Sequence, residues 1–453
     1  MTLWGGRFKQ PLSPMVWDFT TDPIDRRLLL VDIRGSIAHV RALDAAALLS
    51  SEEAGELVAG LEQMRDEAEA GAFAFEPADE DVHTAVERRL VELVGDLGKR
   101  VHTGRSRNDQ VALDLRLYLH QAATHRRADI ERLIAVLADR AEEVAEVVVP
   151  SYTHLQQAQP VSLGHSLLAY AWMLLRDRER LSDAATRIGV SPLGASAGGG
   201  STLPLRPDVA AAEAGLGAVF DNSLDAVASR DFVAEYTFVC AQLMTHLSRF
   251  AEDLVLWASA EFGWVTLPDS HATGSSALPH KRNPDVVELV RARAAGALGD
   301  LTAVLAMQKG LPLAYNRDLQ EDKRPAFHAD DTAAEALQVL ADLIAVVEFH
   351  PPEPAPETTA MLLAERLVLR GVPFREAHEQ VGALLSRLDA DGRHLGNASE
   401  PDLAGSPITL ADLEANDPAE AARMLQSPGS GSPASVAYQV GELRRRIGGT
   451  EPV

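Results

Sequence analysis

Apolar residues recur at helical spacing along most of this chain. The clearest stretch runs from Phe232 to Trp257, where apolar residues follow one another in steps of three and four with no glycine or proline between them. One continuous apolar seam over this length is typical of a helix in a bundle. We therefore predict a long bundle helix here, and Ser229 is a suitable N-cap for it.

The same periodicity predicts further long helices. Asn283 can cap one of them, because the following Pro284 suits a first helical position. Alternating strand patterns are scarce, so we predict an all-α fold built on a central bundle. Long antiparallel helices leave exposed apolar stripes, which indicates oligomerisation. The additional predicted helices are Asp129–Val148, Leu163–Leu181, Pro284–Met307 and Asp330–Glu348.

A proline-rich segment interrupts the helical pattern towards the end of the chain. Pro351–Pro356 contains four prolines and is stiff, so we expect the bundle to end there. A small helical part follows, and the glycine- and serine-rich stretch Ser427–Ser435 interrupts it as a flexible segment.

Composition excludes several classes of function. The 453 residues include 42 basic and 66 acidic ones, for a formal net charge of −24. So acidic a chain repels phosphate, and we expect neither nucleic acid nor membrane as a partner. The first residues lack the layout of a signal peptide, and no stretch approaches the roughly 20 apolar residues that span a bilayer. The single cysteine, Cys240, excludes a disulfide framework, so we expect a cytoplasmic protein.

Four polar segments lie where the helical periodicity pauses, and the first is Gly104–Gln110. It contains two arginines, a serine and an asparagine, and a helix is predicted from Val111 onward. Cationic forks and the positive end of a helix dipole together form an anion site. An N-cap with a solvated first turn explains the same residues equally well.

The second segment, Ser151–Pro160, lies between two long helices. Its His154 is surrounded by hydrogen-bonding side chains that can fix the tautomer of the imidazole, as an acid or base requires. A lone histidine is more often structural, and the chain has 14 of them.

The third segment, Thr273–Pro284, combines small residues, glycine and proline, which is typical of a mobile loop that closes over a substrate. Its Lys281 is one of only five lysines, and a lysine near a serine can lower the pKa of the serine so that it acts as a base. A serine-rich surface loop is the alternative.

The fourth segment, Ala314–Lys323, again follows a helix and breaks the apolar pattern. Its tyrosine, glutamine and lysine side chains can bind a carboxylate, although a solvated charged turn is also possible. A hydrolase pattern, G-x-S-x-G, occurs at Gly194–Gly198, but the following glycines predict a loop where that motif requires a helix. No H-E-x-x-H, paired cysteines or EF-hand spacing indicates a metal site.

Together these segments resemble the fumarase/aspartase superfamily and, within it, the argininosuccinate lyases. The superfamily signature, a Gly-Ser-Ser loop that ends in Lys-x-Asn, matches Gly274–Asn283. The resemblance continues in order from residue 4 to about residue 380, and the last seventy residues carry little of it. The other matching blocks are Trp4–Phe8, Arg105–Gln110, Thr153–Gln156 and Arg317–Lys323.

The resemblance implies a small N-terminal domain over residues 1–106, a helical bundle over 107–350 and a small, mostly helical domain over 351–453. It also implies a homotetramer in which each active site takes segments from three subunits. The implied reaction is the reversible β-elimination of argininosuccinate to arginine and fumarate, through an aci-carboxylate intermediate. Such a reaction needs a base, an acid and fixed positive charge, so we expect no cofactor and no metal.

The resemblance also implies residue roles. Ser275 matches the base, and Lys281 would lower its pKa and stabilise the dianion. His154 matches the acid, acting directly or through a relay. The residues that match substrate-binding positions are Ser106, Arg107, Asn108, Thr153, Asn283, Tyr315, Gln320, Lys323 and His83.

The chain departs from the argininosuccinate lyase pattern at three places. Ala277–Arg282 reads Ala-Leu-Pro-His-Lys-Arg instead of the more frequent Leu-Met-Pro-Gln-Lys-Lys, and Pro279–Pro284 is closer to the adenylosuccinate lyases. Val86 replaces an asparagine, and Thr21–Pro23 replaces a Ser-Ile pair that helps to bind substrate. These changes concern the arginine part of the substrate more than the elimination chemistry.

Two alternatives follow from the same residues. Adenylosuccinate lyase runs the same elimination, but its nucleotide would add a phosphate that needs its own basic clamp. A non-catalytic scaffold is the alternative from another class, because the superfamily includes lens structural proteins. The presence of Ser275, Lys281 and His154 together favours an enzyme.

Overall fold

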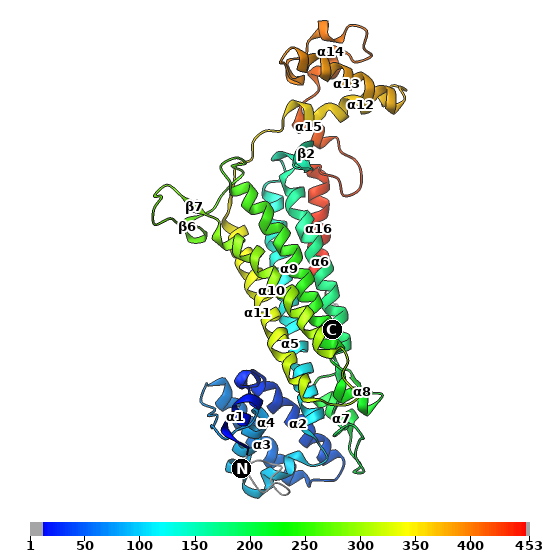
Figure 1. The fold of residues 1–453 in the computed structure, drawn as a ribbon. Helices are drawn as coiled ribbons and strands as arrows, with labels where there is room; N and C mark the ends of the chain where they lie inside the picture. The colour runs from blue at the N-terminus through cyan, green and yellow to red at the C-terminus, as the bar shows by residue number, and fades with distance from the viewer. Residues whose placement is uncertain (1–11, 450–453) are drawn as a thin grey trace.

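The computed structural model describes residues 12–449, so the Trp4–Phe8 block lies outside the described residues. Almost all regular structure is helical, which confirms the predicted all-α fold. Figure 1 shows an elongated molecule with small helices at one end, a long bundle in the middle and a small helical head at the other end. Among the described helices, none is long and apolar enough to cross a membrane.

The N-terminal end is built from short helices whose caps are visible in the sequence. Ser50 forms a capping box with Glu53, and the Asp81 side chain caps the helix that begins at Val82. The elements are α1 (Pro14–Thr20), η1 (Pro23–Leu28), α2 (Leu29–Ala45), α3 (Ser51–Glu69), α4 (Val82–Val94) and η2 (Gly95–His102).

The bundle consists of long helices that pack side by side. The predicted helices are confirmed at four of them, with ends shifted by up to seven residues. The helices predicted from Val111 and over Asp129–Val148 are a single helix, because no breaker separates them and a capping box starts it at Arg107. The bundle helices are α5 (Arg107–Glu143), α6 (Leu163–Ile188), α9 (Asp231–Ala258), α10 (Asp285–Gln308) and α11 (Lys323–Val346).

Two predicted helix caps are wrong. Ser229 ends the short helix α8 (Ser223–Ala228), and α9 starts only after Arg230. Asn283 belongs to strand β7, where its amide lies 3.5 Å from the Gly274 carbonyl oxygen, so its side chain does not cap α10. The Ser229 hydroxyl donates instead to the carboxylate of Asp231, the first residue of α9, at 2.5 Å, and the Asn283 amide faces Gly274 across the β6–β7 hairpin.

Small two-stranded sheets join the helices. The hairpin β1–β2 was not predicted, because its polar residues hide the alternation of a strand. It places His154 in its tight turn, at a φ of 55°. The antiparallel pairs are β1 (Val148–Thr153) with β2 (Gln156–Ser162), β5 (Val265–Thr266) with β8 (Glu348–Phe349) and β6 (Thr273–Gly274) with β7 (Arg282–Asn283), and the parallel pair is β3 (Val190–Ser191) with β4 (Ala218–Val219).

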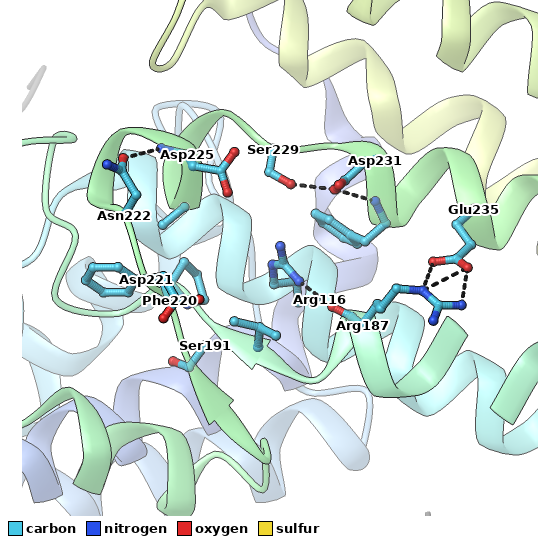
Figure 2. Close-up of a pocket in the computed structure, with 14 residues that line it drawn as sticks. Arg116, Arg187, Ser191, Phe220, Asp221, Asn222, Asp225, Ser229, Asp231 and Glu235 are labelled. Carbon is cyan, nitrogen blue, oxygen red and sulfur yellow. Dashed lines mark hydrogen bonds and ion pairs between the residues drawn. The ribbon is translucent and has the colours of Figure 1, made fainter. Parts of the chain in front are cut away.

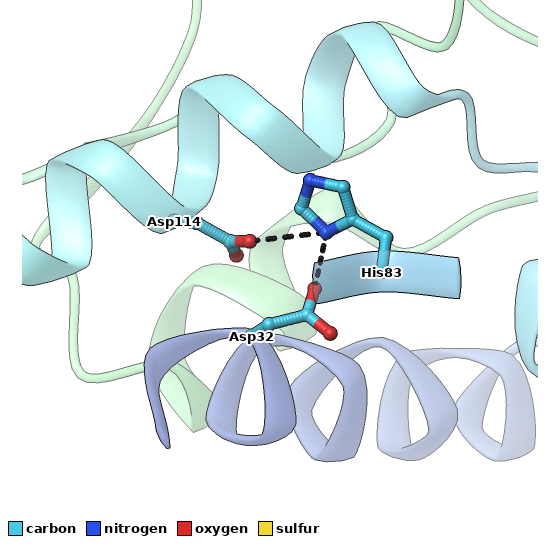
Figure 3. A group of neighbouring side chains, drawn as sticks. All are labelled: Asp32, His83 and Asp114. Atoms are coloured by element: carbon cyan, nitrogen blue, oxygen red, sulfur yellow. Dashed lines mark hydrogen bonds and ion pairs between the residues drawn. The ribbon is translucent and has the colours of Figure 1, made fainter. Parts of the chain in front are cut away.

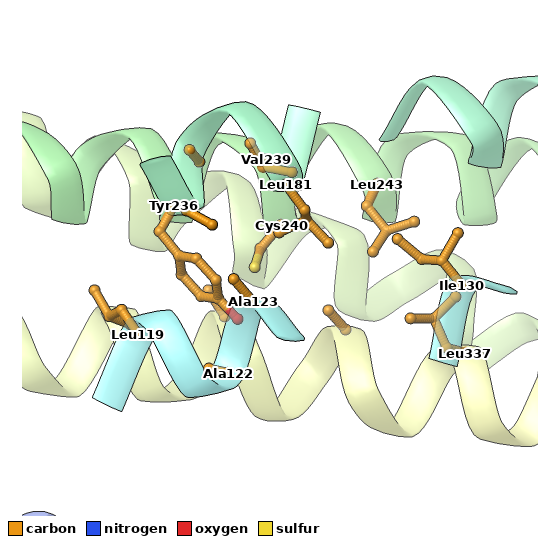
Figure 4. Close-up of a cluster of buried hydrophobic side chains, with 14 of the residues drawn as sticks. Leu119, Ala122, Ala123, Ile130, Leu181, Tyr236, Val239, Cys240, Leu243 and Leu337 are labelled. Carbon is orange, nitrogen blue, oxygen red and sulfur yellow. The ribbon is translucent and has the colours of Figure 1, made fainter. Parts of the chain in front are cut away.

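A continuous apolar core runs along the bundle. Figure 4 shows one section of it, where Tyr236 and Cys240 of α9 meet Ala123 of α5 and where Leu337 of α11 also contributes. Cys240, the single cysteine of the chain, is buried in this layer. Nearly every side chain in this layer is aliphatic or aromatic, so burial of apolar area is its main source of stability.

The head has its own, smaller core. Leu363 and Leu367 of one helix pack against Val381 and Leu384 of another. The last helix, α16 (Pro433–Gly448), leaves the head and packs on α5 and α6. The division at residues 106 and 350 stays a prediction. The remaining helices are α7 (Pro207–Glu213), α12 (Ala360–Leu369), α13 (Phe374–Ala390), α14 (Leu410–Glu414) and α15 (Pro418–Arg423), with 3-10 turns η3 (Asp269–His271), η4 (Arg317–Asp322), η5 (Pro356–Thr359), η6 (Leu395–Asn397) and η7 (Glu400–Leu403).

Candidate active site

The N-terminus of α5 carries the first group of predicted site residues. The Ser106 hydroxyl accepts a hydrogen bond from the backbone amide of Asn108 at 3.2 Å, and Asp109 Oδ1 accepts one from the backbone amide of Ser106 at 2.9 Å. This capping box starts the helix beside Arg107, so the positive end of the helix dipole and a guanidinium lie together. The local arrangement suits an anion.

Asp109 also ties a loop to this helix end. Its second carboxylate oxygen accepts hydrogen bonds from the backbone amides of Ser196 at 2.8 Å and Gly194 at 3.3 Å. The side-chain Nδ2 of Asn108 donates to the Ala197 carbonyl oxygen at 3.2 Å. Burial raises the pKa of Asp109 to about 6 despite these bonds. The Gly194–Gly198 segment is therefore a loop, as predicted. It lies against the N-terminus of α5, and we call it the tied loop.

Arg107 reaches towards the start of α4. Its Nη2 donates to the Thr84 hydroxyl at 3.4 Å, and its Nε lies 3.6 Å from an Asp81 carboxylate oxygen. These contacts are long, and the side chain remains partly exposed. The guanidinium is thus held in place without a short carboxylate pair that would neutralise it.

His83, the second residue of α4, is deeply buried between two carboxylates. Its Nδ1 lies 2.8 Å from Asp32 Oδ1 and 3.3 Å from Asp114 Oδ2, as Figure 3 shows. These residues could in principle hold a cation, but the ring nitrogen already donates to Asp32 and the buried Arg105 guanidinium acts on both acids. We therefore assign a hydrogen-bonded cluster.

The fourth predicted segment forms a chain of hydrogen bonds. Lys323, the first residue of α11, is buried, and its Nζ donates to the side-chain oxygen Oε1 of Gln320 at 2.6 Å. The Gln320 amide in turn donates to the Tyr315 hydroxyl. Beneath them, the fully buried ion pair of Arg230 with Asp322, at 2.5 Å, anchors η4. The segment Ala314–Lys323 is therefore ordered by hydrogen bonds and a buried ion pair, which excludes the alternative of a solvated charged turn.

These first groups lie together at one end of the bundle. Asp25 and Asp81 lie close enough to His83 for its charge to act on their pKa values, and the Lys323 ammonium acts on Asp25 and Asp114. Tyr315 packs against a small apolar cluster that includes Ala195 of the tied loop. We call this group the cradle, and its members are His83, Ser106, Arg107, Asn108, Tyr315, Gln320 and Lys323.

The predicted base lies on a different part of the chain. Ser275, Lys281 and Asn283 belong to the β6–β7 loop, which projects from the side of the bundle in Figure 1. The Ser275 hydroxyl accepts hydrogen bonds from the backbone amides of Ala277 at 3.3 Å and Leu278 at 3.1 Å. Within the described residues Ser275 makes no hydrogen bond to Lys281, whose side chain is exposed.

The predicted acid lies at the opposite end of the bundle from the cradle. Thr153 and His154 are exposed at the tip of the β1–β2 hairpin, which follows α5. With 37 residues, α5 places this hairpin about 55 Å from Arg107 at the usual helical rise. His154 also lines a cavity of about 1210 Å³ between the hairpin, α6, α9 and the head. One chain therefore does not bring the predicted catalytic and substrate-binding residues together.

A further cavity of about 640 Å³ lies between α5, α8 and α9 (Figure 2) and contains none of the predicted site residues. Its buried Arg116 donates to the carbonyl oxygens of Arg187 and Ile188 at 3.0 and 3.1 Å, where α6 ends. The guanidinium also lies 4.0 Å from the centre of the Phe232 ring. Arg116 thus satisfies the free carbonyl groups of a helix end, which is a structural role.

The departures noted in the sequence have simple structural positions. Val86 is only 2% exposed and belongs to the apolar core, so it does not reach the cradle surface. In the Thr21–Pro23 segment, Asp22 caps η1 and pairs with Arg324 at 2.6 Å. This segment lies next to the start of α11, close to Lys323.

Sequence reasoning missed several buried acids around the cradle. Asp32 and Asp114 support His83, and Asp109 supports the tied loop. One signal was available: Asp114 interrupts the apolar run Val111–Leu115, and a charge on a buried helix face indicates a specific partner. The identity of that partner could not be found from spacing alone.

Comparison with known proteins agrees with this architecture. A family model described as lyase matches residues 6–299, and one described as argininosuccinate lyase C-terminal matches residues 357–421. The argininosuccinate lyase of Nitratidesulfovibrio vulgaris (strain Miyazaki F) is 45% identical over 97% of this chain and 98% of its own length. That of Roseiflexus sp. (strain RS-1) is 47% identical over 98% of this chain and 99% of its own.

Solved structures share the fold. EDDS lyase in complex with formate superposes with a TM-score of 0.81 at 25% identity, covering 97% of this chain and 91% of that one. A class II fumarase from Schistosoma mansoni superposes at 0.74 with 16% identity, over 90% of this chain and 93% of that one.

Fold and matched family together define a lyase enzyme with the helical bundle of the fumarase/aspartase superfamily. Within that class the relatives and the C-terminal model are specific. The chain belongs to the argininosuccinate lyase family.

Proposed function

We propose that this enzyme cleaves argininosuccinate to arginine and fumarate by a reversible β-elimination. The observation that carries the proposal is the cradle, a group of cationic and hydrogen-bond-donating side chains at one end of the bundle of an argininosuccinate lyase family member. Fumarate and the succinyl part of the substrate carry two carboxylates, and such donors bind carboxylates well. The acidic net charge does not oppose this, because screened surface charges act weakly at the site.

The elimination needs fixed positive charge near the reacting carbon. Removal of the proton next to a carboxylate produces an aci-carboxylate dianion, and fixed cations lower its free energy. We assign this task to Lys281 of the β6–β7 loop, whereas Arg107, Lys323 and His83 bind the carboxylates of substrate and fumarate alike. Ser106, Asn108, Tyr315 and Gln320 orient the substrate carboxylates. The reaction needs no cofactor in this scheme.

Ser275 acts as the base and His154 as the acid. Lys281 lowers the pKa of the Ser275 hydroxyl and faces the developing dianion when the loop closes, and Asn283 supports this geometry. His154, directly or through a relay, gives a proton to the departing guanidinium nitrogen, while Thr153 contacts the substrate.

The active site is shared among subunits of a homotetramer. The span of about 55 Å along α5 supports this part of the proposal, because no movement of a single chain brings His154 to Arg107. The outer face of α10 is a suitable subunit contact. It exposes Leu289, Leu298 and Leu305 at 50–53%, next to small residues such as Ala292 and Ala295. A cytoplasmic location fits the single, buried cysteine.

The first test is cleavage itself. Purified protein is mixed with argininosuccinate and, separately, with adenylosuccinate, and the ultraviolet absorbance of each reaction is followed. We expect turnover of argininosuccinate alone. Turnover of adenylosuccinate instead would show that the Pro279–Pro284 sequence sets specificity. Cleavage of neither substrate by a folded oligomer would favour a non-catalytic scaffold.

A second test addresses the shared site. Arg107→Gln and Ser275→Ala should each be nearly inactive as pure oligomers. If a site takes these residues from different subunits, random mixed oligomers contain intact sites, and co-expression should restore up to about a quarter of the wild-type activity. Co-expressed variants with no activity above that of the separate ones would contradict the shared arrangement.

A further inference from the structure

The contact of His83 with two acids is unusual, because both approach the same ring nitrogen. Asp32 of α2 and Asp114 of α5 lie 2.8 and 3.3 Å from Nδ1, and all three side chains are almost completely buried, with at most 3% exposed. Figure 3 shows the carboxylates on one side of the ring and Nε2 on the other. Within the described residues Nε2 has no hydrogen-bond partner, so it is available to a ligand.

If both acids are ionised, their buried carboxylate oxygens outnumber the hydrogen-bond donors around them. Asp32 Oδ1 accepts from His83 and from the Gln110 amide, the latter at 2.5 Å. Asp32 Oδ2 and both oxygens of Asp114 are buried and have no hydrogen-bond partner among the described residues. One proton on Asp114 turns an unpaired acceptor into a donor towards Asp32 and removes the repulsion between two buried negative charges.

The electrostatics favour the same distribution. Burial, and next the charge of Asp32, raise the pKa of Asp114 well above its ordinary value. Burial opposes ionisation of Asp32, but the charge and hydrogen bond of His83, together with the Arg105 guanidinium, outweigh burial and lower the Asp32 pKa. The pair thus carries one negative charge, concentrated on the acid closer to His83.

We propose that Asp32 and Asp114 form an acid pair that shares one proton and positions His83 as an imidazolium, with Nε2–H directed at a carboxylate of a bound dicarboxylate. This proposal deepens the proposed function and rests on it for the identity of the ligand. Asp32 and Asp114 are positioning residues, because they act through His83 and do not touch the substrate. The negative charge of the pair offsets the imidazolium charge inside the protein, and the buried Arg105 guanidinium adds a positive charge that acts on both acids.

Other charged groups face the histidine from every element packed around it. The cations lie at the start of α11, at the start of α5 and in the turn before α5, and the acids lie in η1, α2 and α5 and at the N-cap of α4. The ring of His102 stays neutral, because burial and next the Arg105 and Arg107 charges lower its pKa to about 3. The groups are Asp25, Asp32, Asp81, His102, Arg105, Arg107, Asp114 and Lys323.

The pair of variants Asp32→Asn and Asp114→Asn tests the proposal, with fumarate affinity measured by calorimetry between pH 6 and 9. In Asp32→Asn the side-chain amide oxygen keeps the hydrogen bond to Nδ1 but the charge is removed, so the pH above which affinity falls should drop by roughly 1–3 units. At pH 8 we expect a loss of affinity of about tenfold or more. In Asp114→Asn the side-chain amide can donate to Asp32 as the protonated acid does, so the pH profile of this variant should follow that of wild type.

The two variants act as controls for each other. A merely structural cluster would lower the melting temperature of both without moving either pH profile, and this result would overturn the proposal. An Asp114→Asn profile that shifts as far as that of Asp32→Asn would also overturn it, because the proton would then not reside on Asp114.

A measurement on the wild-type protein covers the case in which Asp32→Asn does not fold. Fumarate binding at pH 7.5 is followed in buffers of different ionisation enthalpy, which reports protons taken up on binding. A preformed imidazolium predicts no uptake, whereas a neutral His83 predicts uptake approaching about one proton per site. The cleavage assay separates the two proposals. Argininosuccinate turnover with proton uptake contradicts only the acid pair, and proton-free fumarate binding without turnover contradicts only the proposed function.

Discussion

The cradle and the β6–β7 loop contain predicted site residues in opposite physical settings. In the cradle Lys323 is buried and hydrogen-bonded to Gln320, and His83 is enclosed by Asp32 and Asp114. On the loop Lys281 is exposed, and among the residues that the structure describes Ser275 accepts two backbone hydrogen bonds. One region is organised within the chain, and the other has few contacts that hold it.

This difference separates binding from chemistry. Buried donors that are already oriented bind a carboxylate without further ordering, so the cradle should account for affinity. A base needs its final environment only when the loop closes, so the loop should account for turnover. Variants in the two regions should therefore affect different kinetic constants, and the predictions below test that separation.

The largest effect is expected for Ser275→Ala. Loss of a positioned general base should lower kcat by roughly 10²–10⁴-fold, while KM and fumarate affinity change little. Steady-state kinetics and calorimetry measure the two quantities. Ser270→Ala, an exposed serine at the base of the same loop, is the matched control and should behave as wild type. A variant that keeps its kcat would remove Ser275 as the base.

A smaller effect, and on the other constant, is expected for Lys323→Met. Methionine fills a similar volume but removes the charged donor that bonds Gln320. A hydrogen bond to a charged group contributes about 1.5–3 kcal/mol, so kcat/KM should fall roughly 10–100-fold, mainly through KM. Lys309→Met changes an exposed lysine at the end of α10 and is the control. A fall confined to kcat would contradict the separation between the two regions.

The smallest effect concerns stability and its pH dependence at Asp109. The folded-state pKa of about 6 exceeds the ordinary value of 3.8, so the folded protein binds this proton more tightly than the unfolded chain. Its stabilising contribution is therefore full below about pH 4 and is lost as pH rises through 6. Residue 109 does not titrate in Asp109→Asn. Relative to this variant, the free energy of unfolding of the wild type should fall by on the order of 1–3 kcal/mol across that pH range.

Thermal unfolding of both proteins at several pH values measures this difference. A wild-type protein that gains stability relative to Asp109→Asn between pH 4 and 6 would show that the amide hydrogen bonds from Gly194 and Ser196 outweigh burial. Either sign reports how firmly the tied loop is held against the cradle.

Local sequence predicted the elements better than their ends. The seam from Phe232 to Trp257 is α9 almost residue for residue, because helical spacing of apolar groups is a local property. The predictions that Ser229 and Asn283 cap helices failed, because the Ser229 hydroxyl donates to the side chain of Asp231 and the Asn283 amide faces the Gly274 carbonyl oxygen across its hairpin. The hairpin around His154 was not predicted from the sequence, because pairing between its two strands decides its shape.

The sequence by itself determined that this protein is a helical bundle of the argininosuccinate lyase family, and which polar segments interrupt the helices. Helical periodicity and short motifs are properties of residues close together in the sequence, so they can be identified without the fold. Only the tertiary structure decided that His83 meets Asp32 and Asp114, and that one chain holds Arg107 about 55 Å from His154. Those relations join residues distant in sequence, and packing of rigid helices sets them.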